Sequence, residues 1–305
     1  MPEFPPQIWR LDMKWRNRRQ STNVDDRRHL GSAGGGAPSF QTMLMLWPIV
    51  KRLTRSKLGL AVVGIVAVAY IGGFLDLSPF LGNEGHRLVD EQADDEQAAF
   101  IKTVLADTEA VWSGVFGQAG ARYPAPVLVL YRGATVSGCG PASAGMGPFY
   151  CPEDQKVYVD LGFFEDLKSV HGAGGDFAQA YVLAHEIGHH IQKLEGTLDQ
   201  VQRAKQRVLG KAGKNRLQVM VELQADCYAG IWANHAHKQF DILEEGDLEE
   251  ALVAAASIGD DRLQKQVQGF AIPHTFTHGS SKQRVEWFAR GVMGGRLGDC
   301  DTFKD

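Results

Sequence analysis

Hydrophobic positions along residues 90–305 follow two spacings, and each predicts one type of element. Residues 127–131 (VLVLY) form a short apolar run and residues 156–161 (KVYVDL) alternate, which predicts two strands. Spacings of three and four residues predict helices over 90–118, 177–194, 217–236, 247–258 and 280–290. A strand pair among several helices predicts a mostly helical α+β domain with a small sheet.

Residues 58–75 (LGLAVVGIVAVAYIGGFL) contain no charged residue and no proline. A membrane-crossing helix needs about 20 predominantly apolar residues, so this run predicts one transmembrane helix ahead of the domain. A buried core helix and a cleaved secretory signal are the alternatives. Soluble core helices of this length rarely lack every polar side chain, and secretory signals lie close to the N-terminus, so both are less favoured.

The net charge changes sign at this apolar run. Residues 1–57 carry a net charge of +7 and residues 58–305 carry −11, which together give the overall −4. The positive-inside rule then predicts a single-pass cell-membrane protein with a cytoplasmic N-terminus and an extracytoplasmic or periplasmic domain. The predicted organisation is a basic, largely disordered segment (1–57), the span (58–75), a linker (76–89) and the domain (90–305). Met13, where the basic run begins, is an alternative start to Met1, and the acidic part gives no indication of nucleic-acid binding.

The cysteine content is consistent with an exported domain. All four cysteines follow the apolar run, and an even number predicts two disulfides with three possible connectivities. Cys139 and Cys151 flank a loop rich in glycine and proline, so we favour a short ring closed by this pair. Cys227 and Cys300 would then tie the C-terminal segment to a helix. The alternative is four free, buried thiols; no C-x-x-C pair indicates a cysteine zinc site.

The sequence HEIGH at 185–189 carries the most chemistry. It lies in the apolar run predicted to be helical, and residues four apart share one helix face. His185 and His189 can therefore bind one zinc ion, with Glu186 beside it to accept a proton. A catalytic zinc also needs a third protein ligand and an open position for water.

A second predicted helix supplies candidates for that third ligand. Glu222 and Asp226 are four residues apart, and Glu222 follows His189 by 33 residues, which allows the two helices to pack side by side. We expect Glu222 to bind the metal and Asp226 to accept a hydrogen bond from a ligand histidine, with His185 as the favoured partner.

These residues carry a resemblance to known enzymes. The pattern H-E-x-x-H followed by E-x-x-x-D resembles the gluzincin arrangement of zinc metallopeptidases. More closely, the chain resembles the bacterial "putative neutral zinc metallopeptidase" family, over nearly all of the chain after residue 13. The segments that carry the resemblance are 14–28, 139–152, 157–161, 184–192, 222–230, 258–264 and 276–291. The resemblance implies a zincin-like domain, Zn²⁺ as cofactor and a peptide or protein substrate.

The expected mechanism follows from the metal. Zinc lowers the pKa of a bound water to roughly 7, and Glu186 would accept the water proton as general base. Similar peptidases supply an oxyanion donor from a later histidine or tyrosine. We choose His278 for this role, with Tyr228 second. Residues 156–161 are the candidate edge strand for an extended peptide.

Two hypotheses of different classes remain after this reasoning. The first is a membrane-anchored zinc peptidase. The second is a zinc-stabilised scaffold of the cell envelope that binds partners without cleaving them, against which Glu186 and the open fourth position argue. Hydrolysis of a non-peptide amide would use the same metal site. Substrate preference, the metal bound in the cell and the oligomeric state are not determined by these motifs.

Overall fold

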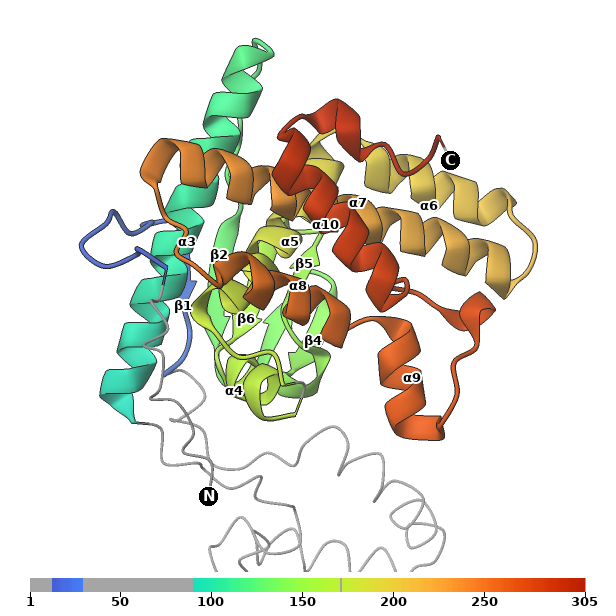
Figure 1. Ribbon diagram of the computed structural model, residues 1–305, viewed down its shortest axis with the longest axis horizontal. Coiled ribbons are helices and arrows are strands. Elements are labelled where there is room, and N and C mark those ends of the chain that lie inside the picture. Colours follow the sequence, from blue (N-terminus) through green and yellow to red (C-terminus); the bar gives the residue numbers. More distant parts are fainter. Residues whose placement is uncertain (1–12, 30–89, 171, 305) are drawn as a thin grey trace, which may run out of the picture. The chain divides into compact units, whose positions relative to one another are not determined.

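A four-stranded sheet with the order β1-β2-β6-β5 supports one side of the domain (Figure 1). The computed structural model describes residues 13–29, 90–170 and 172–304. In it β1, β2 and β6 are parallel, and β5 is antiparallel to β6. The strands are β1 (Val24–Asp26), β2 (Val127–Tyr131), β5 (Phe149–Cys151) and β6 (Lys156–Asp160), and a separate hairpin pairs β3 (Ala134–Ser137) with β4 (Gly140–Ser143).

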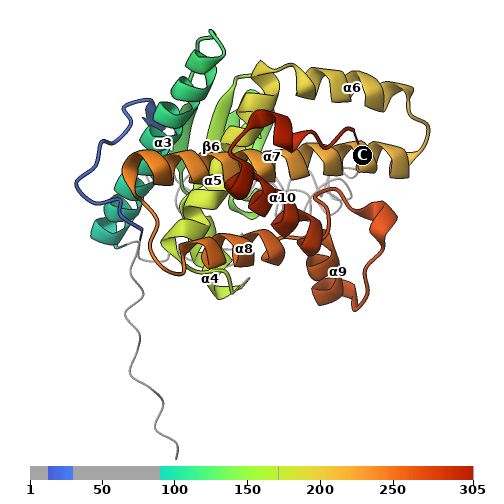
Figure 2. The same ribbon diagram turned by 45° about the horizontal axis from the view of Figure 1, so that its top comes forward.

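Helices account for most of the described residues and confirm a mostly helical α+β fold with small sheets. Helix α5 contacts β5 on one side and α7 on the other, and α10 packs across α7. Figure 2 shows α6 and α7 as a helical hairpin. The helices are α3 (Glu91–Gln118), α4 (Gly162–Ser169), α5 (Asp176–Leu194), α6 (Thr197–Arg207), α7 (Lys211–Phe240), α8 (Asp247–Ser257), α9 (Asp260–Gln268) and α10 (Ser281–Gly294).

The core lies between the sheet and these helices. Leu128 and Leu130 of β2 and Val157 and Val159 of β6 are fully buried, which explains why both central strands are rich in aliphatic residues. Among the helices, large aromatic side chains fill the interior. They include Trp112 of α3, Phe177 and Tyr181 of α5, Trp232 of α7 and Phe288 of α10.

Helices α7 and α10 cross at a pair of glycines. A Cβ atom on Gly230 would lie 2.2 Å from the carbonyl oxygen of Phe288, and one on Gly291 would lie 2.0 Å from that of Cys227. Only glycine permits the two backbones to approach this closely. The crossing fixes α10, and with it Arg284, against the middle of α7.

Both favoured disulfides are present, which confirms the predicted pairing. Cys139–Cys151 joins the turn between β3 and β4 to the end of β5, and Cys227–Cys300 joins α7 to the C-terminal segment. No described cysteine is free.

Residues 13–29 lie in the predicted disordered segment, but the structure places them within the domain. Met13 is buried, and β1 pairs with β2 from Val24 opposite Leu128. The basic side chains of this segment bind acidic residues of the domain rather than remaining free. Arg18, for example, donates two hydrogen bonds to the buried Asp107, at 2.7 and 2.8 Å. Further pairs join Lys14 to Asp241 and Glu244, Arg16 to Glu96, and Arg19 to Glu109.

The prediction of a transmembrane helix ahead of the domain requires correction. The predicted span, 58–75, lies outside the described residues, and none of the helices in 13–29, 90–170 and 172–304 is sufficiently long and apolar to cross a bilayer. The longest of them, α3 and α7, each carry several charged side chains, which are costly in hydrocarbon.

The predicted single-pass topology, with the N-terminus and the domain on opposite sides of a membrane, is also wrong. Strand β1 precedes residues 58–75 and β2 follows them, yet the two strands are hydrogen-bonded neighbours in one sheet. Residues on both sides of the predicted span also belong to one compact unit. A single crossing would separate these strands by the bilayer, so a cytoplasmic N-terminus with an extracytoplasmic domain contradicts the fold.

Candidate metal centre

Helices α5 and α7 bring the three predicted metal ligands together. The Oε2 atom of Glu222 lies 3.2 Å from Nε2 of His185 and 3.5 Å from Nε2 of His189. The three ligand atoms all lie within 4.8 Å of one another, and their side chains are largely buried. Histidines one turn apart on α5 and a carboxylate from the neighbouring helix thus face one point.

Glycine in the motif allows this approach. A Cβ atom on Gly188 would lie 2.9 Å from the carbonyl oxygen and 3.0 Å from the Cα atom of Ala225. Ala225 lies between Glu222 and Asp226 on α7, so the two helices are closest beside the site. The absence of a side chain at Gly188 therefore sets how far Glu222 must reach.

Each ligand histidine has a hydrogen-bond acceptor at its other ring nitrogen. Nδ1 of His185 lies 2.8 Å from Oδ1 of Asp226, and Nδ1 of His189 lies 2.9 Å from Oε1 of Gln192. Because both partners accept, each Nδ1 carries a proton, which leaves Nε2 as the ring nitrogen that can bind a metal where the three side chains converge. The structure thus brings Asp226 to His185, the histidine we favoured.

The residues present fit a zinc ion. Two imidazole nitrogens and one carboxylate oxygen form a ligand set that catalytic zinc sites use. The surroundings also favour positive charge at this point. Burial lowers the pKa of His185, but Asp226 and Glu222 outweigh burial and raise this pKa to about 10. A second acidic group, Asp176 with Asp247 and Glu250, offers carboxylates alone.

Two residues that sequence reasoning missed hold Asp226 in place. Arg284 of α10 donates from Nε to Oδ2 and from Nη2 to Oδ1 of Asp226, both at 2.8 Å, and the Tyr181 hydroxyl donates to Oδ1 at 2.5 Å. Burial raises the pKa of Asp226, but Arg284 and His185 outweigh it and lower this pKa to about 2. Asp226 is therefore ionised and aimed at His185. A single arginine on a distant helix carries no local signal for this role.

Glu186 lies beside the ligands and is buried. Burial raises the pKa of its carboxyl group above the usual value, although His189 and His185 partly oppose the shift. A backbone hydrogen bond from Tyr150 links this side chain to β5. The carboxylate is thus held between the metal ligands and the edge of the sheet.

The two candidates for the oxyanion donor, His278 and Tyr228, have different hydrogen-bond partners. His278 lies in a loop whose neighbour, Gly279, packs against Leu223, next to Glu222. Its Nδ1 atom lies 3.2 Å from Oδ1 of Asp260, and the backbone N–H groups of 277, 278 and 279 donate to Oδ2 of Asp260. The hydrogen bond to Asp260 raises the pKa of His278.

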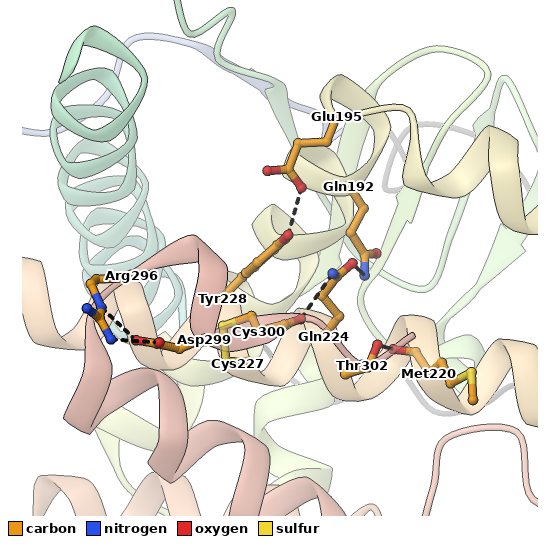
Figure 3. Close-up of a disulfide and its surroundings, with 10 residues drawn as sticks. All are labelled: Gln192, Glu195, Met220, Gln224, Cys227, Tyr228, Arg296, Asp299, Cys300 and Thr302. Carbon is orange, nitrogen blue, oxygen red and sulfur yellow. Dashed lines mark hydrogen bonds and ion pairs between the residues drawn. A yellow bond between two sulfur atoms is a disulfide. The ribbon is translucent and has the colours of Figure 1, made fainter. Parts of the chain in front are cut away.

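Tyr228, the second candidate, is engaged elsewhere. Its hydroxyl donates to Oε2 of Glu195 at 2.7 Å (Figure 3). Because a tyrosine has one hydroxyl proton, this bond uses the donor that an oxyanion would need.

The predicted edge strand is wrong. Strand β6 lies between β2 and β5, so its backbone is paired on both sides, and the outer strands of the described sheet are β1 and β5. The alternating pattern of 156–161 reflected burial rather than an exposed edge, because four of the five β6 residues are buried.

Comparisons with known proteins find relatives that match most of the chain. The uncharacterized protein YpfJ of Escherichia coli K12 is 47% identical over 299 residues, covering 95% of this chain and 99% of that protein. The uncharacterized protein Mb2605 of Mycobacterium bovis is 45% identical over 205 residues, covering 64% of this chain and 67% of that protein. No solved structure matches the chain.

The family model described as "Putative neutral zinc metallopeptidase" matches residues 13–303. The match includes helices α5 and α7, which carry the candidate ligands, and the N-terminal segment that forms β1. Given this match and the 47% identity to YpfJ across almost the whole chain, the protein belongs to the putative neutral zinc metallopeptidase family.

Proposed function

We propose that this protein is a zinc-dependent peptidase in which His185, His189 and Glu222 hold the metal. The observation that supports this most strongly is the convergence of two Nε2 atoms and one carboxylate oxygen at a single buried point. A zinc ion bound there would polarise the scissile carbonyl and make a water molecule more acidic. Family membership supports a peptide as the substrate class.

Glu186 is the general base in this proposal. Its carboxylate lies next to the ligands but is not the group that holds either histidine at Nδ1, so it is available to accept a proton from water. Burial raises the pKa of Glu186, which brings the group closer to neutral pH, where accepting and returning a proton are both efficient. The same carboxyl group can then protonate the leaving amine.

His278 is the donor to the developing oxyanion. Asp260 holds the ring at Nδ1 and also fixes the loop backbone through three N–H groups. The raised pKa of His278 favours a protonated ring, and a protonated ring can donate from Nε2. A donor placed in advance at the oxyanion stabilises the transition state.

The outer edge of β5 is the proposed binding surface for the peptide backbone. It is the sheet edge nearest the site, since β5 contacts α5 and Tyr150 reaches Glu186. An extended peptide can add to such an edge as a further strand, so that its main chain is held by hydrogen bonds independent of sequence.

The test separates metal binding from catalysis. We expect the purified protein to bind one zinc and to cleave members of a diverse peptide library, with cleavage removed by a chelator and restored by zinc. Glu186→Gln should retain zinc but lose about 10²–10⁴-fold in rate. His189→Ala and Glu222→Ala should lose zinc. Glu249→Gln, an exposed glutamate on α8, is the matched control and should behave as wild type.

Two outcomes would contradict the proposal. Full turnover by Glu186→Gln would remove the general-base role. Stoichiometric zinc binding without cleavage of any library peptide would favour the zinc-stabilised scaffold instead.

A further inference from the structure

The C-terminal tail, residues 297–304, is fastened to α7 beside the ligand Glu222. The Cys227–Cys300 disulfide holds it covalently, and the Thr302 hydroxyl donates to the carbonyl of Met220 at 2.7 Å (Figure 3). Both cysteines are fully buried. Met220 and Cys227 lie on either side of Glu222 along the helix, so the tail follows the segment of α7 that carries the metal ligand.

A line of buried amides connects this tail to His189. The Cys300 carbonyl accepts from Nε2 of Gln224 at 3.1 Å, and Oε1 of Gln224 accepts from Nε2 of Gln192 at 3.0 Å. Oε1 of Gln192 then faces Nδ1 of His189 at 2.9 Å. We refer to Gln192, Gln224 and the Cys300 carbonyl as the amide relay.

The relay has one direction. A carbonyl can only accept, so Cys300 requires the NH₂ group of Gln224 to face it, which turns Oε1 of Gln224 toward Gln192. Gln192 must then present its own NH₂ group, which also reaches the carbonyl of Val221 at 2.7 Å. Its remaining oxygen can only accept from His189. The Cys300 carbonyl therefore favours the tautomer of His189 with its proton on Nδ1, in which Nε2 can bind a metal.

We infer that the disulfide-held tail is a positioning element for the metal centre, acting on His189 through Gln224 and Gln192. The inference rests on the proposed function insofar as His189 is taken to be a zinc ligand. If the Gln192 amide turned over, its NH₂ group would face Nδ1 of His189 and the proton would move to Nε2, where a metal could not bind. Gln224 and the Val221 carbonyl both oppose that turn, because each accepts from the Gln192 NH₂ group. Loss of a residue that hydrogen-bonds a metal ligand typically lowers metal affinity about 10- to 100-fold.

The experiment measures zinc affinity by competition with a chromophoric chelator. Gln192→Met should weaken zinc binding about 10- to 100-fold. Gln192→Glu keeps an acceptor for Nδ1 but sets a carboxylate oxygen against the Val221 carbonyl, so it should restore only part of the affinity. Gln224→Met and the double variant Cys227→Ser/Cys300→Ser should weaken binding in the same direction. Combined, their effects should be less than additive, because both act on the same relay.

Two matched controls address general destabilisation. Gln206→Met makes the same side-chain change at an exposed position of α6. Cys139→Ser/Cys151→Ser removes the other disulfide, which no hydrogen bond of the relay touches. Both controls should keep wild-type zinc affinity.

A second readout does not require zinc. In the metal-free protein, solvent exchange of the His189 Nδ1–H proton, followed by NMR, should be slow in wild type and in Gln192→Glu. It should be fast in Gln192→Met and intermediate in Gln224→Met. Unchanged exchange and zinc affinity in both methionine variants, or additive effects of Gln224→Met and the disulfide variant, would overturn the inference. If wild type binds no zinc, the proposed function fails while proton exchange still decides the relay.

Discussion

Replacing Gly188 with alanine tests whether the approach of α5 to α7 sets the metal geometry. The added Cβ atom would lie 2.9 Å from the carbonyl oxygen, 3.0 Å from Cα and 3.3 Å from Cβ of Ala225. Ordinary contacts between such atoms are about 3.5–4.0 Å, so the helices must move apart by about 0.5 Å at this point. The carbonyl oxygen and Cα of Ala225 are backbone atoms of α7, so they cannot turn aside as the end of a flexible side chain could.

The expected effects on stability and on zinc binding differ in size. Overpacking costs about 1–3 kcal/mol, and alanine recovers about 1 kcal/mol of helix propensity, so the free energy of unfolding should fall by only about 0–2 kcal/mol. Zinc sites tolerate deviations of about 0.2 Å in ligand distance. A shift of about 0.5 Å between the two histidines and Glu222 should therefore weaken zinc binding at least about 10-fold.

Urea unfolding measures the first quantity and chelator competition the second. Gly114→Ala in α3 is the matched control, because a Cβ atom there meets nothing within 4 Å. It should leave zinc affinity unchanged and stabilise the protein by up to about 1 kcal/mol. Zinc affinity of Gly188→Ala within about twofold of wild type would refute the reasoning that the helix contact sets ligand geometry.

Four further predictions address the groups around the site and the N-terminal segment. Arg284→Leu leaves the Asp226 carboxylate buried without its cation and should cost about 3–5 kcal/mol in urea unfolding, whereas an unchanged unfolding midpoint would argue against the pair. The pKa of Asp226 is about 2 in the folded protein, below its usual 3.8, so the stability that the ionised carboxylate contributes is complete above pH 3.8 and is lost as pH falls toward 2. Asp226→Asn should therefore flatten the acid side of a curve of unfolding free energy against pH. His278→Gln should lower kcat about 10²–10³-fold without changing zinc affinity, and Asp260→Asn should lower kcat by less. Equal kcat in wild type and in His278→Gln would exclude the donor role. Arg18→Met removes the ion pair with buried Asp107 and should lower the unfolding free energy by about 3–5 kcal/mol. An unfolding free energy equal to wild type would show that the packing of the N-terminal segment does not depend on this ion pair.

Local patterns predicted the elements that depend on local geometry. The four-residue spacing of His185 and His189 places both on one helix face in any helix, so their convergence needed no tertiary information. The same spacing placed Asp226 one turn from Glu222 on α7. Cysteine number and loop position led to the disulfide pairs that the structure contains.

Predictions that depended on long-range pairing fared worse. Residues 156–161 were the candidate edge strand, but β5 pairs with β6 along the edge away from β2. Strand order is set by contacts between segments rather than within them. The basic residues around Arg18 read as a disordered segment, since their acidic partners lie about 90 positions away on α3. An apolar run and a charge step likewise predicted a topology that the pairing of β1 with β2 contradicts.

The sequence by itself therefore determined the chemistry available to this protein: two histidines, a neighbouring glutamate and a second helix with a carboxylate to complete the ligand set. The tertiary structure decided how that chemistry is held. Arg284 contacts Asp226, and Gln224 joins Gln192 to the Cys300 carbonyl, through hydrogen bonds between residues that are far apart in the chain. The physical reason is that a helix repeats every 3.6 residues whatever surrounds it, whereas a buried hydrogen bond needs a partner that only the packing of other elements can supply.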